Sequence, residues 1–155
     1  MKTFADEKEA LYRSLSEGRL SPVRGLVHLL DRLDAHAIPV AVATSAPPDN
    51  VGHTLSELGL AARLSCIVRS DQVPRGKPFP DGYLRACEFL GSDPARSVAV
   101  EDSTNGVRSA FAAGMKVVCV PPGFHPPAED TLALCAAVLD TLDGLTEELL
   151  RSFAS

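Results

Sequence analysis

The sequence predicts an α/β fold with a mostly parallel sheet flanked by helices. Short apolar runs rich in β-branched residues recur along the chain, and each is too short for a helix, as in strands buried on both faces. Segments with apolar residues at helical spacing alternate with these runs, which is typical of parallel strands joined by helices. The expected strands are 39–43, 66–69, 98–100, 116–120 and 136–139.

The predicted helices begin near residues that can cap a first turn. Ser21 is expected to open the second helix, because a proline follows it at the first helical position. Asp49 or Asn50 is expected to cap the third helix, Asp81 the fourth and Ser103 the fifth. The expected helices are 5–18, one that follows Ser21, one that ends near residue 59, 82–90, one that follows Ser103, and 142–153.

Composition and charge restrict the classes of protein. A chain of 155 residues is expected to form one domain, and its net charge of −5 argues against a nucleic-acid or anionic-membrane surface. No apolar run is long enough for a transmembrane helix and no signal-peptide core is present, so we expect a cytoplasmic protein. The four cysteines are widely spaced and are expected to be buried, reduced thiols.

An acidic pair, Glu101 and Asp102, directly follows the expected strand 98–100. Adjacent carboxylates repel each other unless a cation or hydrogen bonds compensate their charge. In an open α/β sheet the turn after a strand lies at the edge where ligands bind. Hard oxygen ligands of this kind suit Mg²⁺. The alternative is a surface turn that is acidic without a function.

Two further segments carry polar residues after a strand. Thr44 and Ser45 follow the first expected strand, where their hydroxyl groups and the N–H groups of the next helix are suited to bind an anion. The alternative is that both hydroxyl groups satisfy only their own turn. Lys77 stands between Gly76 and Pro78, which keep its backbone extended, so its ammonium can neutralise phosphate charge or restrain a carboxylate. The alternative is a solvated loop lysine.

Three motifs together resemble those of the haloacid dehalogenase (HAD) superfamily, in particular its β-phosphoglucomutase-like phosphatase and mutase branch. They are V-A-V-A-T-S-A-P, G-K-P-F-P-D and V-A-V-E-D-S-T-N-G-V-R-S-A-F-A-A-G-M, in this order. The resemblance extends from Ser21 onward and implies a Rossmann-like core. It also implies that Thr44, with Ser45 beside it, binds the transferring phosphoryl group, that Lys77 stabilises its charge, and that Glu101 and Asp102 hold Mg²⁺.

The function implied by this resemblance is Mg²⁺-dependent phosphoryl transfer, as a phosphatase or phosphomutase, on a small phosphorylated metabolite through an aspartyl-phosphate. Residues 1–19 then correspond to a remnant of a helical cap and residues 20–155 to the core. The alternative is a non-catalytic α/β module that binds a metal or an anion. No nucleic acid or membrane is expected among the partners.

The chain departs from the family pattern in one respect. The family nucleophile is the first aspartate of a D-x-D motif at the end of a central strand, and no D-x-D occurs in these 155 residues. The corresponding strand would lie between the strand before Thr44 and the strand before Glu101. We therefore expect this chain to be the C-terminal part of a longer protein, inactive alone, and to self-associate through the open sheet edge.

Overall fold

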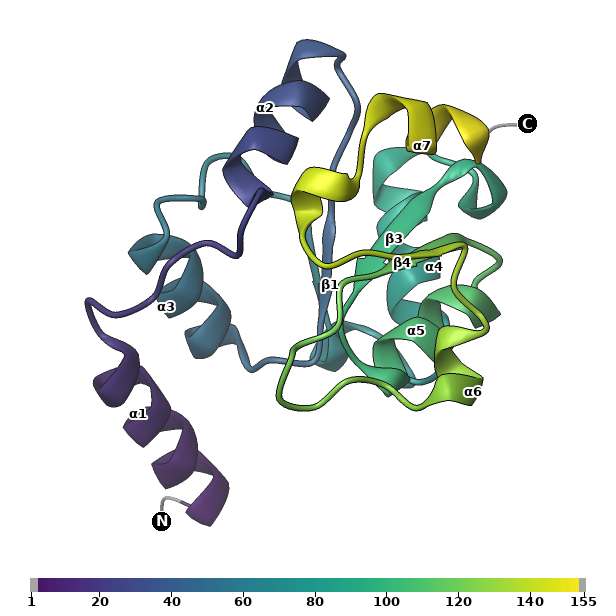
Figure 1. Ribbon diagram of the computed structural model, residues 1–155. Coiled ribbons are helices and arrows are strands. Elements are labelled where there is room, and N and C mark those ends of the chain that lie inside the picture. Colours follow the sequence, from purple (N-terminus) through teal and green to yellow (C-terminus); the bar gives the residue numbers. More distant parts are fainter. Residues whose placement is uncertain (1–2, 154–155) are drawn as a thin grey trace.

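The strands form two parallel sheets in the computed structural model, which describes residues 3–153 (Figure 1). In the first sheet β1 (Val42–Thr44) pairs with β2 (Ile67–Arg69). In the second, β4 (Lys116–Cys119) lies between β3 (Val98–Glu101) and β5 (Ala137–Val138). Each pairing is parallel, which confirms the predicted α/β fold.

Helices cover both faces of this strand layer (Figure 1). One apolar cluster packs α4 and α5 against β3 and β4, and it includes Tyr83, Val107 and Val117. A second cluster on the opposite face packs Leu29 of α2 against Val118. The helices are α1 (Phe4–Ser16), α2 (Leu26–Ala35), α3 (Pro48–Glu57), α4 (Asp81–Leu90), α5 (Thr104–Ala112), α6 (Glu129–Leu132) and α7 (Glu147–Ser152), with short 3-10 turns η1 (Ser70–Gln72), η2 (Pro94–Arg96) and η3 (Leu142–Gly144).

The two sheets are not joined by hydrogen bonds between β1 and β3 in the described part of the chain. The carbonyl groups of Ser97 and Glu101 accept hydrogen bonds from the N–H groups of Lys116 and Val120. Because backbone polar groups alternate in direction along a parallel strand, those of the even-numbered residues of β3 point away from β4. The unpaired edge of β3 therefore faces the side of β1, and Val100 on this strand is 40% exposed.

The predicted start of the second helix is wrong. The helix begins at Leu26 rather than after Ser21, and Gly25 precedes it in the left-handed conformation with φ 87°. A Cβ atom at Gly25 would lie 2.5 Å from the backbone nitrogen of Asp143. The segment around Asp143 passes so close to residue 25 that only glycine fits there. This tertiary contact accompanies a helix start at Leu26, whereas the local capping signals at Ser21 predict an earlier one.

Two further cap predictions are also wrong. Asp49 and Asn50 lie inside α3, and the buried Asn50 side chain accepts a hydrogen bond from Arg13 at 2.7 Å. Asp81 is the first residue of α4 and pairs with Arg75 at 2.9 Å. In both cases an arginine takes the side chain that could have capped the helix: Arg13 comes from α1, and Arg75 from the loop just before α4.

Several element ends differ from the predicted ones. The first strand is displaced from 39–43 to Val42–Thr44, where it is in register with β2. The predicted helix 142–153 is divided into η3 and α7, because the Thr146 side chain accepts a hydrogen bond from Leu149 N and starts a new helix. All four cysteines are free thiols, as predicted, but the predicted burial is confirmed only for Cys87 and Cys119, since Cys66 and Cys135 are half-buried. No helix within residues 3–153 is long and apolar enough to cross a membrane.

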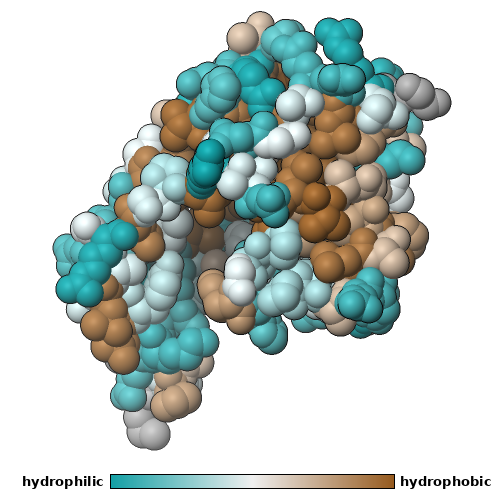
Figure 2. All heavy atoms as spheres, in the orientation of Figure 1, coloured by the Kyte–Doolittle hydropathy of each residue, from teal (hydrophilic) through white to brown (hydrophobic). Residues whose placement is uncertain are grey.

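The first helix, α1, lies at one end of the molecule and contacts α3 mainly through polar side chains. Ser16 lies 2.9 Å from the His53 ring nitrogen, and Asn50 joins Arg13 to Glu9. Figure 2 shows apolar side chains along the outer side of this helix. These exposed residues are Phe4, Leu11 and Leu15.

Candidate functional site

The carboxyl ends of β1 and β2 form one part of the candidate site. Thr44 is the register partner of Arg69. Thr44, Ser45 and Lys77 line one small pocket together with Arg69. Residues from two of the three sequence motifs are therefore brought together. Arg69 also lines the pocket and was not predicted. Its position at the carboxyl end of a strand could have indicated it as a candidate site residue.

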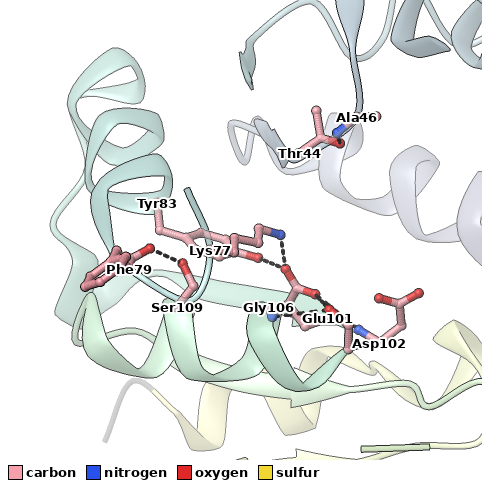
Figure 3. Close-up of polar contacts among 10 residues, drawn as sticks. Thr44, Ala46, Lys77, Phe79, Tyr83, Glu101, Asp102, Gly106 and Ser109 are labelled. Carbon is pink, nitrogen blue, oxygen red and sulfur yellow. Dashed lines mark hydrogen bonds and ion pairs between the residues drawn. The ribbon is translucent and has the colours of Figure 1, made fainter. Parts of the chain in front are cut away.

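The hydroxyl of Thr44 has a partner within its own loop. Its oxygen accepts a hydrogen bond from Ala46 N at 3.0 Å (Figure 3). This contact corresponds to the alternative interpretation of the sequence, in which the Thr44 hydroxyl binds a backbone group of its own turn. Because a hydroxyl group can donate as well as accept, the contact leaves the Thr44 proton able to bind an anion.

Lys77 is not a solvated loop lysine. Its ammonium donates to the Oε1 atom of Glu101, and the two side chains are 17% and 6% exposed. The Tyr83 hydroxyl donates to the same oxygen atom (Figure 3). The Lys77 ammonium also lies 5.0 Å from the centroid of the Tyr83 ring. The sequence reasoning missed Tyr83, because a tyrosine at helical spacing in α4 is also what an ordinary core helix contains.

Glu101 receives two further hydrogen bonds from its own turn. Asp102 N donates to Oε2 at 3.3 Å and the Ser103 hydroxyl donates to it at 3.4 Å. The Ser103 oxygen also accepts a hydrogen bond from Gly106 N at 3.2 Å, so Ser103 is the helix cap that was predicted. Hydrogen bonds and the Lys77 charge thus compensate the buried carboxylate of Glu101.

The Glu101 carboxylate lies directly over Gly106 in the first turn of α5 (Figure 3). A Cβ atom at Gly106 would lie 1.8 Å from Oε2 and 2.4 Å from Oε1. Only glycine leaves room for the carboxylate in this position. Nearby, the buried Ser109 hydroxyl donates to the carbonyl of Phe79 at 2.6 Å and ties the Lys77 loop to α5.

Burial raises the pKa of Tyr83 well above its ordinary value, and the charge and hydrogen bond of Glu101 raise it further. Both effects disfavour the phenolate, since a second negative charge would face the carboxylate in a poorly solvated place. Tyr83 therefore remains a protonated hydrogen-bond donor to Glu101.

Asp102 is exposed, and its carboxylate points away from that of Glu101 (Figure 3). The structure gives this carboxylate no hydrogen bond or ion pair with any residue of 3–153. The same residues contain no group of three or more acidic, histidine or cysteine side chains that could hold a metal ion. The donor set still fits Mg²⁺, which is often bound by one or two carboxylates together with phosphate oxygens and water. The Asp102 carboxylate is the one without a hydrogen-bond or ion-pair partner among residues 3–153, whereas that of Glu101 is engaged by Lys77 and Tyr83.

Comparison with known proteins gives consistent relatives. Residues 2–120 match the model of the haloacid dehalogenase-like hydrolases. Hexitol phosphatase A of Escherichia coli (strain K12) is 35% identical over 129 residues, which cover 82% of this chain and 57% of that protein. The chain spans about half the length of most curated relatives that it matches.

Solved structures share the fold. A HAD hydrolase of family IA, variant 3, from Entamoeba histolytica superposes with a TM-score of 0.87 at 28% identity, and the match covers 97% of this chain and 69% of that one. CbbY from Rhodobacter sphaeroides, in complex with xylulose-(1,5)bisphosphate, superposes with a TM-score of 0.83 at 28% identity, covering 92% and 65% of the two chains.

Proposed function

Because the chain belongs to the family of haloacid dehalogenase-like hydrolases, we propose that it forms most of the core of a phosphatase or phosphomutase. The observation that carries this proposal is the placement of Lys77. Lys77 lines the same small pocket as Thr44 and Ser45, and its ammonium pairs with the buried Glu101.

In the proposed reaction the side chains of this pocket bind and orient a phosphoryl group. Thr44 and Ser45 donate hydrogen bonds to its oxygens, and Lys77 neutralises the charge that develops on them. Asp102, with Glu101 beside it, would hold Mg²⁺. When bound, the metal neutralises phosphate charge and helps to orient the phosphoryl group.

The proposed substrate is a small phosphorylated metabolite, with a sugar phosphate favoured. Two relatives support this choice by their names: one is a hexitol phosphatase, and the other was solved with xylulose-(1,5)bisphosphate. Neither name identifies the substrate of this chain. We also propose that residues 1–19 belong to a helical cap and residues 20–155 to the core. The polar contacts between α1 and α3 support that division.

We further propose that residues 1–155 alone do not catalyse phosphoryl transfer. Thr44, Lys77, Glu101 and Asp102 orient groups and stabilise charge, and none of them matches the D-x-D aspartate that the family uses as covalent acceptor. The unpaired edges of β1 and β3 are sites where another strand can add. Self-association through these edges is therefore part of the proposal, and sedimentation at increasing protein concentration tests it.

Binding of inorganic phosphate, followed by isothermal titration calorimetry, tests the pocket. Lys77→Ala is expected to lose most of the phosphate affinity, because Lys77 is one of the two cationic residues that line the pocket and the other, Arg69, is paired with Asp71. Lys116→Ala is the matched control, since Lys116 is exposed at the amino end of β4. Equal phosphate affinity of the wild-type chain and Lys77→Ala would contradict the proposal.

Two further measurements test the metal site and the lack of activity. Asp102→Asn is expected to weaken Mn²⁺ binding relative to the wild-type chain, because it removes the free carboxylate. Purified residues 1–155 are expected not to hydrolyse phosphate monoesters with Mg²⁺ present. Robust hydrolysis by residues 1–155 that is lost in Asp102→Asn would refute the proposed inactivity. If a longer chain with upstream sequence binds metal and phosphate but does not hydrolyse phosphate monoesters, the non-catalytic alternative is favoured.

A further inference from the structure

We propose that Tyr83 is a positioning residue, whose hydroxyl and ring hold Glu101 and the Lys77 ammonium, so that the Lys77 side chain keeps its place along the pocket that it lines together with Thr44. This inference rests on the proposed function, because it concerns the phosphate pocket defined above. It adds a residue that the motifs of the sequence do not contain.

One carboxylate oxygen of Glu101 is shared by two donors. Lys77 and Tyr83 both donate to Oε1 of Glu101. A hydrogen bond from the neutral hydroxyl takes up part of the carboxylate's acceptor capacity, so the carboxylate is satisfied without engaging every donor of Lys77. The ammonium has three N–H donors, and those not directed at Glu101 are available to a second anion.

The Tyr83 ring is held more rigidly than the Lys77 side chain. Tyr83 is 8% exposed and packs in the apolar cluster with Ala99 and Val107, so the core sets the position of its ring. The lysine side chain, in contrast, is a flexible four-carbon stem with a compact charge at its end. Its ammonium lies 5.0 Å from the centroid of the Tyr83 ring, within the range of cation–π attraction. The fixed aromatic ring thus confines the mobile cation.

A purely structural role is the alternative to be tested. A buried tyrosine hydroxyl needs some hydrogen-bond partner, and Glu101 would serve merely as that partner. In that case removal of the hydroxyl changes the stability of the chain and leaves the position of Lys77 unchanged. Positioning predicts that the Lys77 side chain moves.

Side-chain NMR of the lysines in the full 155-residue chain separates the two roles. Tyr83→Phe keeps the ring and removes the hydroxyl, and it is expected to shift the Lys77 methylene resonances next to the ammonium. Tyr12→Phe is the matched control, because Tyr12 is the other tyrosine of the chain and lies 41% exposed on α1. Unchanged Lys77 resonances in a folded Tyr83→Phe chain would overturn the proposal. The wild-type chain provides a second measurement: nuclear Overhauser contacts between Lys77 and the Tyr83 ring are expected, and their absence would also overturn it.

Phosphate affinity supplies the functional readout. Tyr83→Phe is expected to weaken inorganic phosphate binding about threefold to tenfold, toward the lower end of the coupling expected between residues of one hydrogen-bond network. Tyr12→Phe is expected to bind phosphate as the wild-type chain does. If Lys77→Ala loses phosphate and Tyr83→Phe does not, the pocket stands and the positioning role is refuted. If Lys77→Ala binds normally, the proposed pocket fails, and the NMR result alone decides whether Tyr83 positions Lys77.

Discussion

Replacement of Gly106 by alanine tests whether the Glu101 carboxylate lies where the structure has it. The new Cβ atom would lie 1.8 Å from Oε2 and 2.1 Å from Cδ of Glu101. No contact between unbonded atoms is that short, so the carboxylate has to leave its position. It would then lose its hydrogen bonds from Lys77 and Tyr83.

The expected magnitude is the difference between two opposing effects. Hydrogen bonds to a charged group contribute about 1.5–3 kcal/mol each, and two of them are lost. Alanine is favoured over glycine in a helix by about 1 kcal/mol, which offsets part of that loss. The free energy of unfolding of Gly106→Ala is therefore expected to fall by about 2–5 kcal/mol.

Urea denaturation followed by far-UV circular dichroism measures this change. Gly52→Ala is the matched control, because Gly52 lies in α3 and nothing stands within 4 Å of the Cβ atom that it would acquire. This control is expected to be as stable as the wild-type chain or more stable, by up to about 1 kcal/mol. If Gly106→Ala behaves like Gly52→Ala, the carboxylate does not lie over residue 106 and the reasoning is refuted.

Three further predictions concern other parts of the chain. In hydrogen exchange, the Val100 amide, on the unpaired side of β3, is expected to exchange much faster than the Ala99 amide, which points toward β4; equal protection would contradict the unpaired edge. Burial raises the pKa of the Cys119 thiol from 9.0 to about 11, so its neutral form stabilises the folded chain fully below pH 9, and that contribution is lost as the pH rises toward about 11. Thermal melts of Cys119→Ala are then expected to depend less on pH than wild-type melts between these values, and an identical dependence would rule the effect out. Ser109→Ala removes the hydrogen bond to Phe79 and is expected to destabilise the chain by about 1–3 kcal/mol in urea denaturation, since it leaves a carbonyl group without its partner; an unchanged midpoint would show that this bond is dispensable.

Local sequence determined most of the secondary structure. Apolar runs such as 98–100 and 117–120 identify strands because buried strands contain few polar residues. The helix cap at Ser103 was also predictable from the sequence, because its side chain accepts a hydrogen bond from the backbone N–H only three residues away. Features of this kind depend only on neighbours in the chain, and the order of strands and helices then fixes the α/β class.

The sequence also determined which residues stand at the carboxyl ends of strands or in the loops that follow them, and with them Thr44, Lys77, Glu101 and Asp102 as candidates for the site. Only the tertiary structure decided which contacts the side chain of each of these residues makes. Glu101 turns inward to Lys77, whereas Asp102 turns away, although the two are adjacent and chemically alike. Alternation along the chain at the end of β3 directs the two side chains to different sides; Glu101 is the one held inside because α4 brings the Tyr83 hydroxyl to its side and Gly106 leaves space there. For the same reason Asn50 and Asp81 are not helix caps. Asn50 instead pairs with Arg13, which only the packing of α1 on α3 brings close, and Asp81 pairs with Arg75 of the preceding loop.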